Sequence, residues 1–179
     1  MLEQRGDLWV LAHQLKCDAV CITTNGFLKK DGSAVMGRGY AREAMLRWPD
    51  LPELIGSRLK ISFHIELFSK HLFKDIFYDL IAFPTKPKQF IVNDLQSNIV
   101  KRQRVNFGPG CVTPGWAAMA DPKLIEKSSY ELMELINRNN WQKVLLPSPE
   151  VKSNKILWED KLKPIIMKIL DDRVIVTSK

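Results

Sequence analysis

The chain has 179 residues, of which 45% are hydrophobic and 26% are charged. This length and balance are typical of one globular domain that buries a core without disulfide or metal support, and they exclude a fibrous or disordered chain. The 27 Lys and Arg residues outnumber the 20 Asp and Glu residues, which gives a net charge of +7. Such a charge favours anionic partners such as nucleotides or nucleic acid.

The cysteines and the N-terminus indicate the compartment. Cys17, Cys21 and Cys111 form an odd set without metal-ligand spacing, so we expect neither a disulfide framework nor a zinc site, and no cofactor. The N-terminal residues lack the basic and then apolar order of a signal peptide, and no apolar run approaches the roughly 18 residues that cross a membrane. We therefore expect a cytoplasmic protein without membrane contacts.

Apolar runs alternate with helical spacing along the chain. The alternation predicts an α/β fold with a mostly buried sheet. Pro164 either kinks the last predicted helix or marks where its regular part begins. The expected strands lie at residues 19–23, 76–83, 144–147 and 173–177, with a hairpin over 62–83, and the expected helices run from Arg38 to before Pro49, from Asp121-Pro122 to about Asn139, and from Trp158 to Leu170.

Residues 93–120 fit none of these patterns. The segment is long and rich in turn residues, and such a loop inside a compact domain is usually functional or disordered. We interpret it as an insertion lying over the surface of a single domain that spans residues 1–179. Trp116 near Lys101, Arg102 and Arg104 suits a lid that stacks on a base, or single-stranded nucleic acid, or a buried anchor for the loop.

The segment "VMGRGYAREA" follows a predicted strand and opens a predicted helix. Because a helix N-terminus leaves N–H groups unpaired and carries partial positive charge, this arrangement suits phosphate, and Arg38 between Gly37 and Gly39 adds charge. The same residues equally fit a plain tight turn, since neither the P-loop nor the dinucleotide pattern is present.

Asn25 ends the first predicted buried strand. Its amide can donate and accept at once, which suits ribose hydroxyls. An Asn before Gly26 is also the common turn-forming pair, so both readings stay open.

The run "GDLWVLAHQLKCDAVCITTNGFLKKDGSAVMGRGYA" resembles the opening of a macrodomain. "IAFPTKPKQF", "DPKLIEKSSYELMELI", "KVLLPSPE" and "ILWEDKLKPIIMKILDD" are similar, in the same order, to later segments of a macrodomain subfamily found in bacteria and phages. The resemblance implies a three-layer α/β/α fold with a mixed central sheet and an ADP-ribose cleft at the carboxyl ends of the strands.

The resemblance also implies roles for individual residues. Asp7 would accept from the adenine amino group, Asn25 would hold the terminal ribose, and the backbone from Val35 to Tyr40 would cradle the diphosphate; Asp7 equally suits a helix cap. The implied ligand-binding residues are Asp7, Leu8, Thr24, Asn25, Val35, Met36, Gly37, Arg38, Gly39, Tyr40, Pro149, Val151, Ser153 and Asn154.

The second phosphate loop departs from the family pattern. Glu150, Val151 and Lys152 stand where the family has small residues, and a carboxylate there repels a diphosphate unless a cation offsets it. Lys86 in "FPTKP" matches a catalytic lysine that attacks the anomeric carbon in one macrodomain class, and Asn25 is the second candidate catalytic residue. Lys86 equally fits a surface residue between two prolines. The aspartate of that class is replaced by Ser153 or Asn154, and neither is a general base near neutral pH.

Three functions therefore stay open. The chain binds ADP-ribose or a related nucleotide without turnover, or it removes ADP-ribose from a substrate or dephosphorylates ADP-ribose phosphate. In the second case Asp31, Glu150 or His64 would replace the missing aspartate. The third function is a non-catalytic interaction module for an ADP-ribosylated protein or for nucleic acid.

Overall fold

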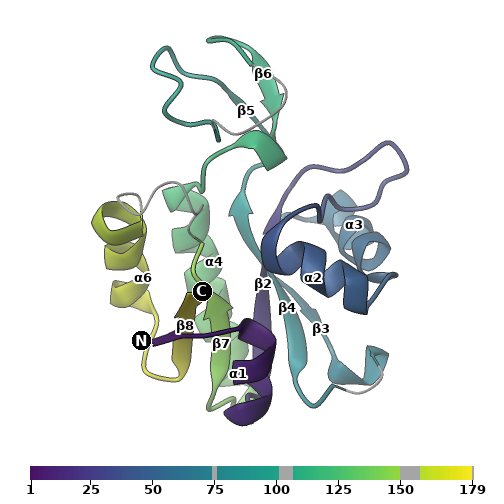
Figure 1. The fold of residues 1–179 in the computed structure, drawn as a ribbon, viewed down its shortest axis with the longest axis vertical. Helices are drawn as coiled ribbons and strands as arrows, with labels where there is room; N and C mark the ends of the chain where they lie inside the picture. Colours follow the sequence, from purple (N-terminus) through teal and green to yellow (C-terminus); the bar gives the residue numbers. More distant parts are fainter. Residues whose placement is uncertain (74–75, 101–106, 150–157, 179) are drawn as a thin grey trace.

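A computed structural model describes residues 1–73, 76–100, 107–149 and 158–178. Its centre is a mixed sheet in the order β1-β8-β7-β2-β4-β3 (Figure 1). β3 is antiparallel to β4, whereas the other neighbours are parallel, so the carboxyl ends of five strands meet at one edge. The strands are β1 (Leu2–Arg5), β2 (Ala19–Asn25), β3 (Glu66–Phe68), β4 (Asp79–Lys86), β7 (Val144–Pro147) and β8 (Val174–Ser178).

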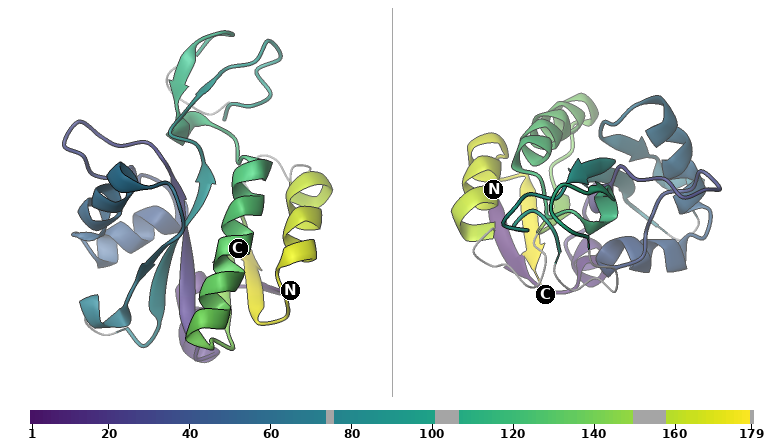
Figure 2. Two further views of the ribbon diagram at one scale, coloured as in Figure 1. Left: turned by 180° about the vertical axis from the view of Figure 1, so that it is seen from behind. Right: turned by 90° about the horizontal axis from the view of Figure 1, so that it is seen from above.

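Helices cover both faces of this sheet. One face packs against α1 (Leu8–Gln14), α2 (Gly39–Arg47) and α3 (Leu51–Ile61), and the other packs against α4 (Pro122–Asn139), the π-helical turn η3 (Trp158–Leu162) and α6 (Lys163–Ile169). The result is the expected three-layer α/β/α arrangement, which the view from above shows as two groups of helices flanking the strands (Figure 2). No helix among the described residues is both long and apolar enough to cross a membrane.

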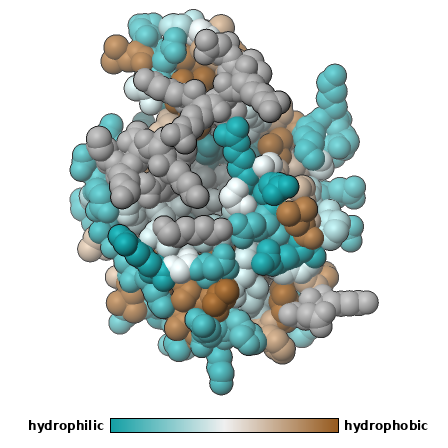
Figure 3. Space-filling model, viewed as in Figure 1, coloured by the Kyte–Doolittle hydropathy of each residue, from teal (hydrophilic) through white to brown (hydrophobic). Residues whose placement is uncertain are grey.

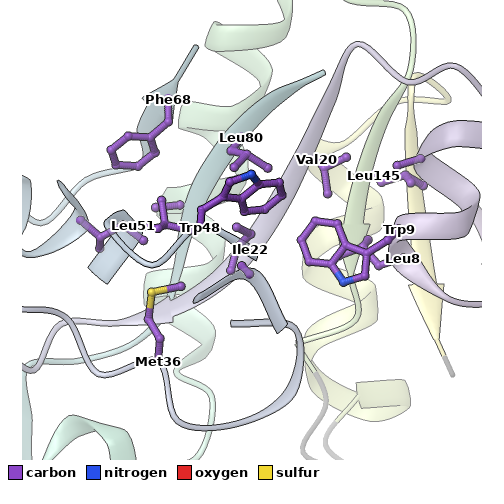
Figure 4. Packing of buried hydrophobic residues seen from close by; sticks show 14 of the residues in the cluster. Leu8, Trp9, Val20, Ile22, Met36, Trp48, Leu51, Phe68, Leu80 and Leu145 are labelled. Atoms are coloured by element: carbon purple, nitrogen blue, oxygen red, sulfur yellow. The ribbon is translucent and has the colours of Figure 1, made fainter. Parts of the chain in front are cut away.

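β2 shows why the sheet is buried on both sides. Val20 and Ile22 belong to the core cluster under α1, α2 and α3, whereas Ala19 and Cys21 belong to the cluster under α4 and α6. Alternate side chains of a strand point to opposite faces, so a continuous apolar run fills both layers. Around Ile22 the first cluster packs Trp9 and Trp48 edge-on at 5.5 Å (Figure 4).

The three predicted helices lie close to their expected bounds, the last as η3 followed by α6. Asp121 caps α4 by accepting from the backbone N–H groups of Lys123 at 2.9 Å and Leu124 at 3.3 Å, and Asn140 ends it in the left-handed conformation. Pro164 lies in the first turn of α6, where its missing N–H costs nothing. It therefore marks the start of the regular helix rather than a kink.

Four elements differ from the sequence expectation. The second predicted strand, expected at 76–83, runs from Asp79 to Lys86, because it follows β2 to the carboxyl edge. β1, α1 and α3 were not predicted: all four β1 side chains are exposed and show no alternation, α1 has only seven residues, and α3 follows α2 after a short turn. The hairpin over 62–83 is confirmed, with Glu66 opposite Ala82 and the short 3₁₀ helix η1 (Lys70–Leu72) in its turn.

The segment interpreted as an insertion contributes to an arm, defined here by the described residues 89–100 and 107–118. Its antiparallel strands β5 (Gln89–Ile91) and β6 (Val112–Pro114) and the 3₁₀ turn η2 (Gly115–Ala117) extend beyond the ends of β2 and β4 (Figures 1 and 2). The arm thus begins earlier than residue 93 and projects from the domain instead of lying flat on it. Trp116 packs edge-on against Phe107 at 6.1 Å within the arm's own cluster, so it anchors the arm internally.

Candidate functional site

Asn25 and Lys86 lie opposite each other at the carboxyl ends of β2 and β4. The register shifts between Thr24 and Asn25, so that Thr24 faces Pro84 while Asn25 faces Lys86. Pro84 has no N–H to give to the ladder, which fits an irregularity at this point. The sheet therefore brings together the two residues that the sequence analysis named as candidate catalytic residues.

The Asn25 amide fastens the next loop to the end of its strand. Its Oδ1 accepts from the Phe27 N–H at 3.1 Å, and its Nδ2 donates to the Val35 carbonyl at 2.9 Å. The first bond is the Asn turn that the sequence suggested. The second holds the start of the Val35–Tyr40 segment next to the strand edge, so the turn and the site share one residue.

The Val35–Tyr40 segment leads into α2 with exposed backbone. Met36 is buried in the core and anchors it, whereas Gly37, Arg38 and Gly39 are exposed. Gly39 has φ +57°, a conformation that favours glycine, and a Cβ at Gly37 or Gly39 would meet no atom within 4 Å. Open space in front of a helix N-terminus suits an anionic ligand.

Asp7 and Leu8 start α1 beside the end of β8. Asp7 Oδ1 accepts from the N–H groups of Trp9 at 3.0 Å and Val10 at 3.3 Å, so Asp7 is the helix cap. The Gly6 N–H donates to the Ser178 carbonyl at 3.0 Å, which fixes this turn on β8, and Leu8 is fully buried. The cap places Asp7 at the same sheet edge as Asn25.

A set of contacts between α1 and α2 was not predicted. Trp9 Nε1 donates to Glu43 Oε2 at 2.8 Å, and the Arg47 guanidinium lies 4.7 Å from the Trp9 ring centre. Tyr40 packs edge-on against the same ring at 6.3 Å. These contacts fasten α1 to α2. Sequence reasoning missed them because Trp9 and Glu43 are far apart in the chain and follow no motif.

Lys86 is half-buried with its amine in an unfavourable setting for charge. Burial, and to a lesser degree the positive charge of Arg38, lower its pKa from the ordinary value of 10.5 to about 8. A lysine with a lowered pKa carries more of the neutral, nucleophilic amine near pH 7. This shift favours a functional role for Lys86 over that of an ordinary surface lysine.

The remaining candidates fall in other places. Pro149 is buried after β7, whereas Glu150, Val151, Lys152, Ser153 and Asn154 lie outside the described residues. Asp31 accepts from the Ser33 N–H at 2.9 Å and borders an open pocket of about 430 Å³ near the α2–α3 junction. His64 contacts Glu131 on α4 at 2.6 Å. Among the described residues no group of three or more His, Cys, Asp or Glu could hold a metal.

The fold and the site define a class of protein: an α/β/α sandwich whose polar residues gather at the carboxyl edge of parallel strands, where such sheets bind ligands. A scan against protein-family models and a search of curated proteins both find no match.

Solved structures identify the fold. The macrodomain of Thermus aquaticus DarG is 16% identical, with a TM-score of 0.64 and coverage of 99% of this chain and 97% of that one. The macrodomain of Mycobacterium tuberculosis DarG is 18% identical, with a TM-score of 0.63 and the same coverage. Thermosipho africanus DarTG in complex with ADP-ribose is 15% identical, with a TM-score of 0.62. The match includes 99% of this chain but only 41% of that one. The chain has the macrodomain fold.

Proposed function

We propose that the chain binds ADP-ribose or a related ADP-ribosyl nucleotide along the carboxyl edge from β8 to β4. The edge spans four neighbouring strands, or about 14 Å at about 4.8 Å per strand, which suits an extended ligand with two sugars. Of the similar structures, that of Thermosipho africanus DarTG contains ADP-ribose. The observation that carries the proposal is the pairing of Asn25 with Lys86 at this edge, next to the exposed segment around Arg38.

The residues of the edge give the ligand a direction. Asp7 and Leu8, at the β8 end, lie where the adenine would bind. The N–H groups at the start of α2 and the Arg38 side chain face the diphosphate, since both favour negative charge. Asn25 and Lys86, at the β4 end, receive the terminal ribose. Pro149, directly after β7, adds a residue to the proposed site; Val151, Ser153 and Asn154 remain proposed ligand-binding residues that lie outside the described residues.

Lys86 also supports a second candidate function, the removal of ADP-ribose from a modified substrate. The neutral amine attacks the anomeric carbon of the terminal ribose, the bond to the acceptor breaks, and the acceptor leaves with a proton; water then releases ADP-ribose from the lysine. With a pKa of about 8, about a tenth of the lysine is neutral at pH 7. Lys86 does not supply the proton for the leaving acceptor, and this proposal assigns that proton to no residue.

Titration calorimetry of the unmodified protein with ADP-ribose tests the binding proposal. We expect saturable 1:1 binding and a rise in the unfolding temperature with ligand concentration, because a ligand that binds only the folded state stabilises it. AMP alone should bind more weakly because it lacks the terminal ribose. Absence of any heat or shift at millimolar ADP-ribose would refute the proposal.

Turnover separates the remaining functions. Release of ADP-ribose from an ADP-ribosylated substrate, or of phosphate from ADP-ribose 1″-phosphate, that disappears in Lys86→Ala favours the enzyme. The net charge of +7 favours the interaction module as the alternative. Nucleic-acid affinity that falls steeply with salt, together with no nucleotide binding, would select that module.

A further inference from the structure

Three buried hydroxyl oxygens lie at the carboxyl ends of neighbouring strands without a hydrogen-bond partner among the described residues. They belong to Thr24 on β2, Ser148 directly after β7, and Thr177 on β8. We call these three residues the hydroxyl row. Thr24 is 7% exposed and Thr177 is 1% exposed.

Two members of the hydroxyl row directly follow apolar strand residues. Val174, Ile175 and Val176 precede Thr177, and Leu145, Leu146 and Pro147 precede Ser148; all six are buried. The change to a hydroxyl occurs where each strand reaches the same edge. A buried hydroxyl without a partner costs about 1–3 kcal/mol, so three at one edge indicate partners that the described residues do not provide.

The row has a defined geometry. Thr177 pairs with Pro147, and the Ser148 N–H donates to the Thr177 carbonyl at 2.8 Å. Thr24 and Thr177 each follow by two residues an isoleucine, Ile22 or Ile175, in the cluster beneath α1 and α2, so both point to that face. The strand order β8-β7-β2 separates them laterally by about 10 Å.

We propose that the hydroxyl row supplies hydrogen bonds to a bound nucleotide along its length, with Thr177 at the adenosine end, Ser148 at the diphosphate and Thr24 at the terminal ribose. This inference rests on the proposed function. Thr177 precedes Ser178, whose carbonyl holds the turn that carries Asp7, and Thr24 precedes Asn25. The order of the row thus matches the direction of the ligand.

Access to the row requires a small movement. The three oxygens are covered from solvent, but a rotation of about 120° around χ1 moves a side-chain hydroxyl to a neighbouring staggered position. A ligand that brings ring nitrogens, sugar hydroxyls or phosphate oxygens to the edge repays this rotation, because it gives each hydroxyl the partner that it lacks.

The test uses substitutions that keep shape and remove the hydroxyl: Thr177→Val, Ser148→Ala and Thr24→Val. Titration calorimetry with AMP, ADP and ADP-ribose measures each. We expect each loss to be about 3- to 10-fold, the net worth of one hydrogen bond. Thr177→Val weakens all three ligands by a similar factor, Ser148→Ala weakens ADP and ADP-ribose, and Thr24→Val weakens ADP-ribose alone.

Two controls separate a ligand contact from a structural role. Thr113, whose hydroxyl donates to the Cys111 carbonyl at 3.2 Å, and Ser129, whose hydroxyl donates to the Ile125 carbonyl at 2.8 Å, have partners in the protein. Thr113→Val and Ser129→Ala therefore leave the affinities unchanged and lower the unfolding temperature. In contrast, the three variants of the row keep or raise the unfolding temperature of the free protein, since a methyl group replaces an unpaired hydroxyl.

Each contrary result has a separate meaning. If the unmodified protein binds ADP-ribose and the row variants bind it equally well, the row proposal is wrong and the proposed function stands. If the row variants lose several degrees of unfolding temperature, their hydroxyls are structural and the row proposal is again wrong. If the unmodified protein binds no nucleotide, both proposals fall.

Discussion

Lys86 combines a place in the proposed site with a cost in stability. Its pKa is about 8 in the folded chain against 10.5 ordinarily, so the unfolded chain binds more protons between these two pH values. The free energy of unfolding therefore rises with pH across this window. Below pH 8 the protonated, half-buried amine destabilises the fold, and above about pH 10.5 this penalty is gone.

Lys86→Met should therefore stabilise the protein at pH 7, by about 1 to 3 kcal/mol, while any turnover that needs the amine is lost. The gain should shrink as the pH rises from 8 to 10.5. Urea unfolding at pH 7 and at pH 10 measures both values, and Lys30→Met, at a fully exposed position, serves as the control. Equal stability of the wild type and Lys86→Met at pH 7 would show that the amine is not strained.

Asn25 stabilises the site through both ends of its amide. Asn25→Ala removes the bonds to Phe27 and Val35 and should weaken ADP-ribose binding by about 1 to 3 kcal/mol, the cost of leaving buried polar partners unpaired. Titration calorimetry checks this value. Asn25→Asp keeps the acceptor for the Phe27 N–H but loses the donor to Val35, so it should bind about as weakly as the alanine variant. Wild-type affinity in both variants would remove Asn25 from the site.

At the scale of single residues, the sequence predicted those features that follow from a local pattern. The resemblance put Asn25 and Lys86 at strand ends, and Asp7 was recognised as a potential helix cap. Two further features depend on how distant segments pair, which no local pattern shows. They are the register that sets Asn25 opposite Lys86, next to Pro84, and the bond from Asn25 to Val35. The unpaired state of Thr177 is visible only when all of its neighbours are placed.

At the scale of elements, α3 positions the loop that leads into the proposed site. The Ala34 N–H donates to the Pro52 carbonyl at 2.9 Å, and a Cβ at Gly56 would overlap the Gly32 carbonyl and press on Ser33. This loop continues into the Val35–Tyr40 segment. The close approach of α3 therefore sets where that segment begins, although no α3 residue was named as a site residue.

Gly56→Ala should destabilise the protein by about 1 to 3 kcal/mol, the usual cost of overpacking, and should weaken ADP-ribose binding because the loop must shift. Gly37→Ala is the matched control for stability: a Cβ there meets no atom, so thermal unfolding should change little. If Gly56→Ala unfolds at the wild-type temperature, the loop adjusts without strain and α3 does not position it.

Elements were predictable in proportion to their local signal. α4 has an Asp-Pro start and a long apolar face with Ile125, Leu132 and Ile136 fully buried, and its bounds were predicted. α3 also carries apolar residues at helical spacing, Leu51, Ile55 and Leu59, but the prolines around its start obscure this signal. β1 carries no such signal, because it is a short edge strand with exposed side chains, and only its pairing with β8 defines it.

At the scale of the whole molecule, the arm is a separate packing unit at the site's edge. Val92, Ile99 and Ala117 form its core with Phe90, Phe107 and Trp116, and none of them belongs to the two clusters of the domain. Its outer side exposes Ile91, Leu95 and Val112, and brown hydrophobic atoms gather on the arm at the top of Figure 3.

Backbone hydrogen bonds join the two segments that connect the arm to the domain. The Gly115 N–H donates to the Lys88 carbonyl at 2.8 Å, and the Asp121 N–H donates to the Thr85 carbonyl at 2.9 Å. A Cβ at Gly115 would overlap the Pro87 carbonyl, so the segments that enter and leave the arm are in direct contact. We call these two segments, which start at Pro87 and at Gly115, the neck. The neck starts directly after Lys86, so in the proposed site the arm lies beside the group that is attached to the terminal ribose.

Replacing Gln89–Pro114 by Asn-Gly, with Trp116→Ser to avoid an exposed indole, should therefore leave a folded domain. Lys88 and Gly115 are already hydrogen-bonded, and a two-residue turn closes such a pair. We expect the unfolding temperature to change by at most about 5 °C, since the two core clusters of the domain are untouched, and the affinity for free ADP-ribose to stay within a few-fold. If turnover of an ADP-ribosylated macromolecule falls while that of ADP-ribose 1″-phosphate persists, the arm contacts the acceptor; loss of the cooperative unfolding transition would instead make the arm part of the domain's core.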